Sequence, residues 1–259
     1  MELKLLTLNL HAWLEENQEE KFQIIADYIY KNDIDIVTFQ EANQNRDKIL
    51  VNENIREDNP SLIISNFLKK MGKNYNFIWD WSHYGYDVYE EGLSILTKHP
   101  IDSSKSIFVS ESQDVKFWKT RKTIKAEINL GHKSINVFSC HMGWLRDKEE
   151  PFEKQITKLY DFVKEEGKSS LIMGDFNNSD DTEGYDLIKK LGFKDLYNKT
   201  SENHGFTVKE KIAGWENNDK FLRIDYIFSN IEYEVIESQV VFEEKRVSDH
   251  FGVYTKIKI

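Results

Sequence analysis

Cysteine is almost absent from this chain of 259 residues, which holds only Cys140. A disulfide framework and a cysteine-ligated zinc site are therefore both excluded. The chain has only 3 prolines and 12 glycines, which argues against a disordered linker. No apolar run is long enough to span a bilayer, and the first ten residues lack the features of a secretory signal. The sequence thus predicts a cytoplasmic protein without a membrane partner.

Basic residues are also fewer than acidic residues. The 35 Lys and Arg residues are outnumbered by 45 Asp and Glu residues, which gives a net charge of −10. Proteins that bind nucleic acid usually carry a basic footprint, because phosphate contacts supply much of the affinity. The balance of charge therefore disfavours nucleic acid as a partner, although a local basic patch is compatible with it. The sequence does not indicate an oligomeric state.

Segments rich in β-branched and aromatic residues alternate with amphipathic segments and turn signals. Strands are predicted at 3–9, 34–40, 76–81, 92–97, 122–130, 133–140, 169–174, 222–228, 234–242 and 251–257. Helices are predicted to begin at residues 17, 59, 151 and 182. The sequence shows no repeat and no clear boundary, so residues 1–259 are predicted to form one α/β (α+β) domain with two face-to-face sheets and helices outside.

Several local signals fix the expected ends of these elements. Asn17 and Glu20 fit a capping box, and Asn59 followed by Pro60 fits an N-cap and a first helical position. Gly131 with the next residue fits a short hairpin turn. The aromatic segment between 81 and 92 is predicted to be a loop.

Polar residues stand at the ends of several predicted strands, where an apolar core does not favour them. They are Asn9, His11, Glu41, His141, Asp175, Asn177, Asp225, Asp249 and His250. Each residue alone is explained by a cap, a turn or a satisfied histidine, but the whole set in this order indicates a site. An unpaired buried charge is costly, so these groups are expected to share a metal or hydrogen-bond to one another. The oxygen donors suit magnesium or manganese better than zinc or copper.

The order of these motifs resembles the endonuclease/exonuclease/phosphatase superfamily, and within it a small bacterial branch that includes a maltose-phosphate phosphatase. The matching segments are LNLH at Asn9, QE at Glu41, EGLSIL after Glu91, CH at His141, GDFN at Asp175, RIDYI at Asp225 and SDH at Asp249 and His250. The resemblance extends from residue 9 to residue 250. It implies a four-layered α/β sandwich of two mixed β-sheets, a Mg²⁺ or Mn²⁺ cofactor and phosphoester hydrolysis.

The resemblance also implies a role for each matched residue. Glu41, Asn9 and Asp249 are expected to bind the metal. Asp175 would orient or deprotonate the attacking water, and Asn177 would hold a phosphate oxygen. The histidine His250, oriented by Asp225, and the histidine His141, paired with Glu91, would contact the phosphate. Such carboxylate partners fix the tautomer of an imidazole and are expected to raise its pKa.

Three loops, at residues 83–89, 141–155 and 205–218, are expected to wall a compact pocket beside this site. The expected substrate-binding residues are Arg121, Trp144, Asp147, Tyr86 and Trp215. Arg121 stands where some superfamily members carry a phosphate-binding arginine, while Trp144 and Trp215 fit either a pocket wall or a loop anchor. Aromatic walls with a few polar groups suit a small polar ligand. The sequence therefore favours a phosphatase that acts on a small phosphorylated metabolite such as a sugar phosphate. A phosphodiesterase, either a nuclease or an enzyme similar to a sphingomyelinase, and a non-catalytic regulatory protein are the alternatives.

Overall fold

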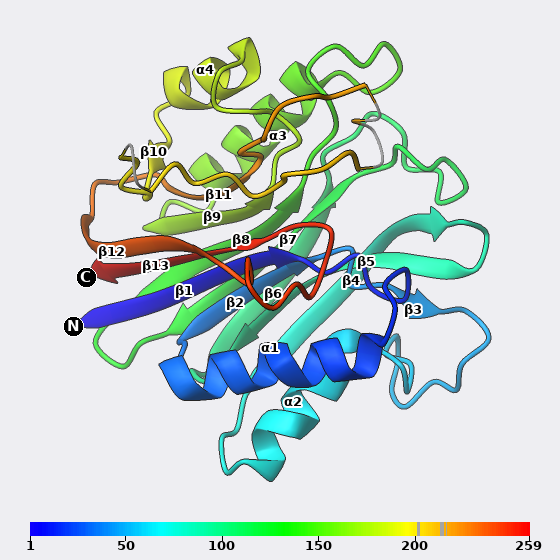
Figure 1. The fold of residues 1–259 in the computed structure, drawn as a ribbon. Coiled ribbons are helices and arrows are strands. Elements are labelled where there is room, and N and C mark those ends of the chain that lie inside the picture. The colour runs from blue at the N-terminus through cyan, green and yellow to red at the C-terminus, as the bar shows by residue number, and fades with distance from the viewer. Residues whose placement is uncertain (201–202, 213–214, 216) are drawn as a thin grey trace.

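The computed structural model of the chain describes residues 1–200, 203–212, 215 and 217–259. Within these residues the backbone forms two mixed β-sheets with helices on their outer faces (Figure 1). This arrangement confirms the predicted fold class.

The first sheet contains the N-terminal and the C-terminal strands. It consists of β1 (Glu2–Asn9), β2 (Ile36–Gln40), β3 (Gln44–Asn45), β4 (Asn76–Gly85), β5 (Tyr89–Thr97), β12 (Glu234–Val241) and β13 (Gly252–Lys258). The strand order is β12-β13-β1-β2-β5-β3, and β4 also pairs with β5. β1 and β2 run parallel, whereas β13 and β5 join this pair in antiparallel fashion.

The second sheet is built from the middle of the chain. Its strands are β6 (Ile101–Phe108), β7 (Lys122–Asn129), β8 (Ser134–His141), β9 (Ser170–Asp175), β10 (Lys194–Asp195) and β11 (Asp225–Ser229). The order is β10-β11-β9-β8-β7-β6, and only β8 and β9 among these described strands run parallel. Each sheet therefore has one parallel pair near its centre.

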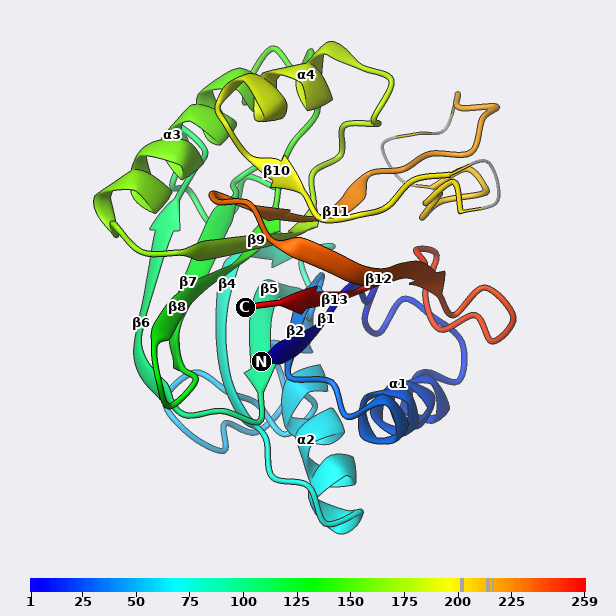
Figure 2. The same ribbon diagram turned by 90° about the vertical axis from the view of Figure 1, so that its left-hand side faces the viewer.

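The layers follow the order helix, sheet, sheet, helix. Helices α1 (Gln18–Asn32) and α2 (Pro60–Lys70) cover the outer face of the first sheet, and α3 (Phe152–Glu165) and α4 (Glu183–Lys190) cover that of the second (Figures 1 and 2). The buried core between the sheets includes Leu5 and Ile36 from the first and Val137, Leu171 and Ile227 from the second. Apolar side chains that alternate along each strand make this inner layer possible, because neighbouring residues point to opposite faces of a strand.

Two of the three local predictions hold. The Asn59 side chain accepts hydrogen bonds from the Ser61 and Leu62 amides at 3.0 and 3.3 Å, as an N-cap does. Gly131 takes a left-handed conformation with φ of 90° in the β7–β8 hairpin. The capping box at Asn17 is wrong, because this residue is itself left-handed and its side chain makes no capping hydrogen bond.

The predicted aromatic loop is a β-hairpin. β4 continues to Gly85 and β5 begins at Tyr89, so the turn contains only three residues. Tyr86 and Asp87 adopt positive φ angles of 50° and 58°, as a tight hairpin with a right-handed twist requires. A register shift between residues 81 and 83 marks a β-bulge in β4. The strands β3, β6 and β10 were not predicted. No helix in the described part of the chain is long and apolar enough to cross a membrane.

Candidate active site

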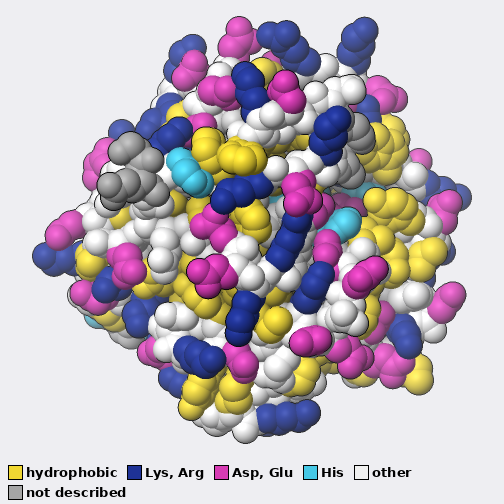
Figure 3. Space-filling model, in the orientation of Figure 1, with side chains coloured by type: hydrophobic (Ala, Val, Ile, Leu, Met, Phe, Trp, Pro, Cys, Tyr) yellow, Lys and Arg dark blue, Asp and Glu magenta, His cyan; other side chains and the backbone are white. Residues whose placement is uncertain are grey.

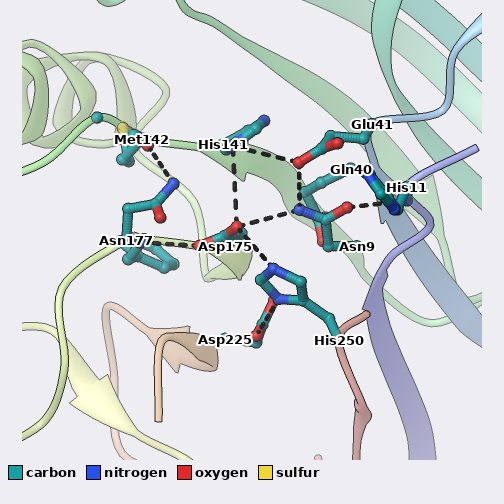
Figure 4. Close-up of polar contacts among 12 residues, drawn as sticks. Asn9, His11, Gln40, Glu41, His141, Met142, Asp175, Asn177, Asp225 and His250 are labelled. Atoms are coloured by element: carbon teal, nitrogen blue, oxygen red, sulfur yellow. Dashed lines mark hydrogen bonds and ion pairs between the residues drawn. The ribbon is translucent and has the colours of Figure 1, made fainter. Parts of the chain in front are cut away.

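Strand register brings the predicted site residues to one end of the sandwich. In the second sheet, Asp175 pairs with His141 on one side and with Asp225 on the other. In the first sheet, Asn9 pairs with the last residue of β2, so Glu41 follows directly at the same edge. Because both parallel pairs end here, side chains from residue 9 to residue 225 converge. Figure 4 shows this convergence, with His250 reaching in from the loop before β13.

Asn9 links the two sheets at this edge. Its Nδ2 atom donates hydrogen bonds to Glu41 Oε1 at 2.8 Å and to Asp175 Oδ2 at 3.1 Å. His141 Nε2 lies 4.0 Å from Glu41 Oε1 and 3.8 Å from Asp175 Oδ2. Glu41, His141 and Asp175 thus place ligand atoms within 4.8 Å of one another, close enough to hold one metal ion.

Burial and neighbouring negative charges raise the pKa values of the carboxylates in this group. The pKa of Glu41 is raised to about 7 by burial and by the negative charges of Glu91 and Asp249. Burial and the neighbouring Asp225 raise the pKa of Asp175 to about 7 as well. A divalent cation would relieve both effects, and oxygen donors are what magnesium and manganese prefer. The donor set therefore fits a hard cation.

His250 forms a short, buried pair with Asp225. Nδ1 of the ring lies 2.9 Å from Asp225 Oδ2, and the two residues are 3% and 0% exposed. Burial opposes a charged ring, but the adjacent Asp225 and Asp175 carboxylates outweigh it and raise the pKa of His250 well above its ordinary value. The direction agrees with the expectation for a histidine paired with a carboxylate. The other ring nitrogen, Nε2, faces Asp175 Oδ2 at 3.9 Å.

His141 behaves differently, and the expected rise in its pKa is wrong. Burial, together with the positive charge of Arg121, lowers the pKa of His141 to about 3, although Glu91 acts in the opposite direction. Glu91 Oε1 lies 3.6 Å from His141 Nδ1, farther than a normal hydrogen bond. His141 is therefore a neutral ring at ordinary pH in this structure.

A cavity of about 290 Å³ opens over these groups. Of the residues predicted from the sequence, those lining it are Glu41, Tyr86, Glu91, Arg121, His141, Trp144, Asp175, Asn177, Asp249 and His250. Asn9 and Asp225 lie directly behind them and are fully buried. The structure therefore brings the predicted metal-binding and catalytic residues together around one cavity.

Two predicted substrate-binding residues lie elsewhere among the described residues. Asp147 does not line the cavity, because its carboxylate pairs with Lys119 Nζ at 2.5 Å and accepts hydrogen bonds from the Glu149 and Glu150 amides. It serves as a loop cap, so the expected substrate contact is not supported. The Trp215 indole donates to Asn177 Oδ1 at 3.1 Å, which places it behind a site residue rather than in the wall.

Some cavity residues were given no individual role from the sequence, although His11 belongs to the predicted set of strand-end polar residues and His83 and Ile212 lie in loops predicted to wall the pocket. They are His11, His83, Gly85, Trp118 and Ile212. His83 and Trp118 precede Glu91 and Arg121 by a few residues, and for Trp118 that proximity is the only signal that was available. Trp118 is 52% exposed and packs against Trp144 with ring centroids 5.8 Å apart.

Arg121 is a buried cation without a carboxylate partner in the described structure. It is 4% exposed, and its Nη1 atom donates to the Trp118 and Thr120 carbonyl oxygens at 2.8 and 3.2 Å. Its Nε atom is buried and makes no hydrogen bond to the described residues. A buried guanidinium that faces a cavity in this state suits an anionic ligand.

The model of the endonuclease/exonuclease/phosphatase family matches residues 10–250 of the chain. The chain belongs to this family and is thus a phosphoesterase of the corresponding superfamily, whose enzymes are generally dependent on divalent metal ions.

Solved structures share the fold along the whole chain. An endonuclease/exonuclease/phosphatase family protein from Leptotrichia buccalis C-1013-b is 34% identical, with a TM-score of 0.90, and the match covers 99% of this chain and 100% of that one. A mannosyl-6-phosphatase from Bacteroides thetaiotaomicron VPI-5482 is 19% identical, with a TM-score of 0.72 and coverage of 99% and 100%. The second likeness shows the fold alone.

A curated relative is larger. Sphingomyelinase C 2 from Leptospira interrogans is 22% identical over 281 residues, which cover 96% of this chain but 44% of that protein. The chain thus spans less than half the length of this relative.

Proposed function

We propose that this protein is a phosphatase that uses Mg²⁺ or Mn²⁺ to hydrolyse a small phosphorylated metabolite such as a sugar phosphate. One observation carries the proposal. The buried group of Glu41, Asp175, His141 and His250 lies at a cavity of only about 290 Å³ with Trp118 among its walls. A small cavity with aromatic walls and a few polar groups suits a compact polar ligand.

In this proposal, Glu41, Asn9 and Asp249 hold the metal. When bound, the ion would neutralise phosphate charge and lower the pKa of a bound water. The raised pKa of Glu41, caused by burial and by nearby carboxylates, supports this assignment. Asp249 belongs to the same rim, because it lines the cavity and its Oδ1 atom lies 3.7 Å from His11 Nδ1.

The chain's own residues would then bind and activate the reactants. Asp175, whose pKa of about 7 reflects burial and the adjacent Asp225, is suited to accept a proton from water near neutral pH. His250 stays protonated through its pair with Asp225, so its Nε2 atom would donate to a phosphate oxygen as negative charge develops. Asn177 is held by hydrogen bonds to Met142 O and from Trp215 Nε1, which fixes its amide at the rim.

Arg121 and the aromatic residues would select the substrate. The guanidinium of Arg121 would balance the second negative charge of a phosphate monoester, because its hydrogen bonds go to carbonyl oxygens and its Nε atom has no partner among the described residues. Tyr86, Trp118 and Trp144, which all line the cavity, would pack against the leaving group.

A second candidate is hydrolysis of a phosphodiester in a lipid head group. Ile49, Leu50 and Val51 are consecutive and are 68%, 51% and 51% exposed. Their loop is tied to the β4–β5 hairpin, because the Arg46 amide donates to Val88 O at 3.0 Å. An exposed apolar loop of this kind is typical of contact with an apolar partner.

Nucleic acid remains the less favoured substrate. On the face drawn in Figure 3, Lys and Arg side chains are interspersed with Asp and Glu side chains rather than gathered in one stripe. A single-sign basic groove would favour a nuclease.

A substrate panel tests the proposal. The protein would be incubated with magnesium and sugar phosphates, nucleotides, plasmid DNA or sphingomyelin, and free phosphate, nicked DNA and phosphocholine would be measured. Phosphate release from a sugar phosphate without DNA nicking is expected, and EDTA should abolish it until magnesium or manganese is restored. Release of phosphocholine alone would favour the second candidate, while no product from any substrate would favour a non-catalytic protein.

The Asp175→Asn variant provides the matched test of mechanism. It should remain folded and lose about 100-fold or more in turnover, the scale of losing a group that stabilises charge in the transition state. Asp186→Asn removes an exposed aspartate on α4 and should change nothing. Equal activity of both variants would contradict the role of Asp175.

A further inference from the structure

A buried histidine outside the motif set contacts the site from behind. His83 lies in β4 immediately after the β-bulge and is 2% exposed. Its Nε2 atom lies 3.4 Å from Glu91 Oε2. A bulge re-aims the side chains that follow it, and here it turns His83 toward the cavity that it helps to line.

Glu91 stands between two imidazole rings. One carboxylate oxygen, Oε2, faces His83, and the other, Oε1, faces His141 Nδ1 at 3.6 Å. The side chains of the three residues are 3%, 16% and 9% exposed, for His83, Glu91 and His141 in that order. The carboxylate is therefore shared between the rings with little access for solvent.

The second ring nitrogen of His83 defines how it meets Glu91. Nδ1 lies 3.0 Å from the Thr120 carbonyl oxygen, and because a carbonyl only accepts hydrogen bonds, Nδ1 carries a proton. A neutral ring would then point the lone pair of Nε2 at a carboxylate, which is repulsive. The geometry therefore favours a proton on Nε2 as well, directed at the Glu91 carboxylate.

The contact between His83 and the Thr120 carbonyl also links the cavity wall to the sheet edge that carries the site residues. The segment from 109 to 121 supplies Trp118 and Arg121, and its Thr120 side chain is held by a hydrogen bond to Asp114 O at 2.8 Å. The Tyr84 amide donates to Val115 O at 2.8 Å, so β4 and this segment are joined at Tyr84 as well as at His83. His83 is thus held against a backbone segment that other hydrogen bonds keep in place.

We propose that His83 is a positioning residue that holds Glu91 and, through it, sets the tautomer and orientation of His141. This inference rests on the proposed function for its catalytic consequence. With Glu91 held by His83, its Oε1 atom stays 3.6 Å from His141 Nδ1, where its negative charge favours a proton on that nitrogen. Nε2 of His141, which faces Glu41 and Asp175, is then presented to the substrate in one defined state. Carboxylates that orient a histidine act in this way in many active sites.

The test compares His83→Leu, His83→Gln and a matched control. Leucine removes both contacts, whereas the glutamine amide can still donate to Glu91. The control is His99→Gln, because His99 also pairs with a carboxylate, Asp35, at 2.9 Å, but does not line the cavity. Thermal unfolding of each variant would establish that it is folded.

Nitrogen chemical shifts supply the readout that a merely structural role would not move. The protein would be labelled with ¹⁵N-histidine and studied in magnesium buffer without substrate, where the chain's 7 histidines are few enough to assign by substitution. In the wild type and in His99→Gln, His141 should show a single tautomer with the proton on Nδ1. In His83→Leu, its two nitrogen shifts should move toward averaged values.

Turnover gives the second readout. His83→Leu should lose about 10- to 100-fold in kcat, the range for removing a group that orients a ligand or catalytic residue, while KM changes little and His83→Gln recovers part of the loss. Unchanged His141 shifts in His83→Leu would overturn the proposal even if turnover fell. If the wild type released no phosphate, the proposed function would fail, but the nitrogen shifts would still decide whether His83 positions His141.

Discussion

At the scale of single residues, the site holds groups that destabilise the fold. Glu41 and Asn177 adopt left-handed φ angles of 45° and 49°, which non-glycine residues rarely do. Glu41 is also a carboxylate with a raised pKa among other carboxylates. Strain and repulsion of this kind are concentrated at functional sites.

Glu41→Gln should stabilise the metal-free protein at alkaline pH. The pKa of Glu41 is about 7 in the folded state, against an ordinary 4.5, so the folded state holds this proton more tightly than the unfolded chain does. The contribution of Glu41 to stability is therefore complete below pH 4.5 and is lost as the pH rises through about 7. In EDTA, the variant should melt a few degrees above the wild type at pH 8 and show a smaller difference at pH 5.

The control for this measurement is Glu53→Gln, which changes an exposed glutamate. It should leave the melting temperature unchanged at both pH values. A lower melting temperature for Glu41→Gln at pH 8 would show that the Glu41 charge is already compensated without metal.

Arg223 tests how much a buried ion pair contributes. It is 2% exposed, its Nη2 atom lies 2.8 Å from Asp195 Oδ2, and its guanidinium packs against the rings of Tyr197 and Tyr226. Arg223→Met would leave Asp195 as an unpaired buried charge, which costs about 3–5 kcal/mol. Urea denaturation should show this loss, and adding Asp195→Asn should recover part of it.

An exposed pair supplies the comparison. Arg146 and Glu183 lie 3.7 Å apart with side chains 84% and 80% exposed. Arg146→Met should therefore cost less than about 1 kcal/mol, as exposed ion pairs do. Equal losses for the two arginine variants would mean that burial does not govern the contribution of Arg223.

At the scale of secondary structure elements, the N-termini of the first two helices differ in what holds them. Asn59 caps α2 through two amides and also donates to Gln44 Oε1 at 2.9 Å, so Asn59→Ala should cost about 2 kcal/mol in unfolding free energy. Asn17 precedes α1 in a left-handed conformation without a side-chain cap. Asn17→Gly should stay within about 0.5 kcal/mol of the wild type, because glycine accepts that conformation freely. A large loss for Asn17→Gly would reveal a contact that the structure does not show.

These two helices also show how far the start of a helix can be predicted from local sequence. Both starts carry an N-cap residue, but at α1 the first helical residue, Gln18, turns its side chain back to accept from the Trp13 amide at 2.7 Å. This hydrogen bond holds the loop before the helix and leaves the first turn of α1 without a side-chain cap. The residue types at positions 17 and 20 do not reveal it. Strand β6 was missed for another reason. Residues 102–106 are all exposed at a sheet edge, so no apolar alternation marks them.

The residues of the candidate site also divide into those that the sequence predicts and those that it does not. The strand-end residues such as Asn9, Asp175 and Asp225 were predictable, because strand ends of one sheet edge meet in space and their motif order was specific. His83 and Trp118 were not, since they reach the cavity through the β4 bulge and the 109–121 segment. Asp147 was expected at the substrate from its loop position, which did not reveal its ion pair with Lys119.

At the scale of the whole molecule, a buried polar chain joins the two sheets behind the site. Thr38 Oγ1 donates to Thr7 Oγ1 at 2.8 Å, and Thr7 Oγ1 donates to Gln40 Oε1 at 3.3 Å. Gln40 Nε2 then donates to Ser139 Oγ of the second sheet at 3.1 Å, and Ser139 Oγ donates back to Phe39 O. Buried polar groups favour one arrangement, because any shift leaves them unsatisfied. The sheets are therefore expected to form and unfold as one unit.

The single cysteine makes this prediction measurable. Cys140 lies in β8 of the second sheet and is fully buried, and burial raises the pKa of its thiol to about 12. A thiol reagent should therefore not react with the folded protein, because the thiolate is the reactive form and the side chain is inaccessible. In a urea series, pulse labelling of Cys140 and the far-UV circular dichroism of both sheets and the helices should share one midpoint. Labelling at a lower urea concentration would mean that the second sheet opens alone, and the polar chain would then not couple the sheets. Magnesium offers an internal check, because the proposed ligands Asn9, Glu41 and Asp249 all come from the first sheet, whereas Cys140 lies in the second. If the sheets are coupled, saturating ion should move both midpoints upward together, whereas a shift of the circular dichroism alone would mean that the second sheet unfolds independently.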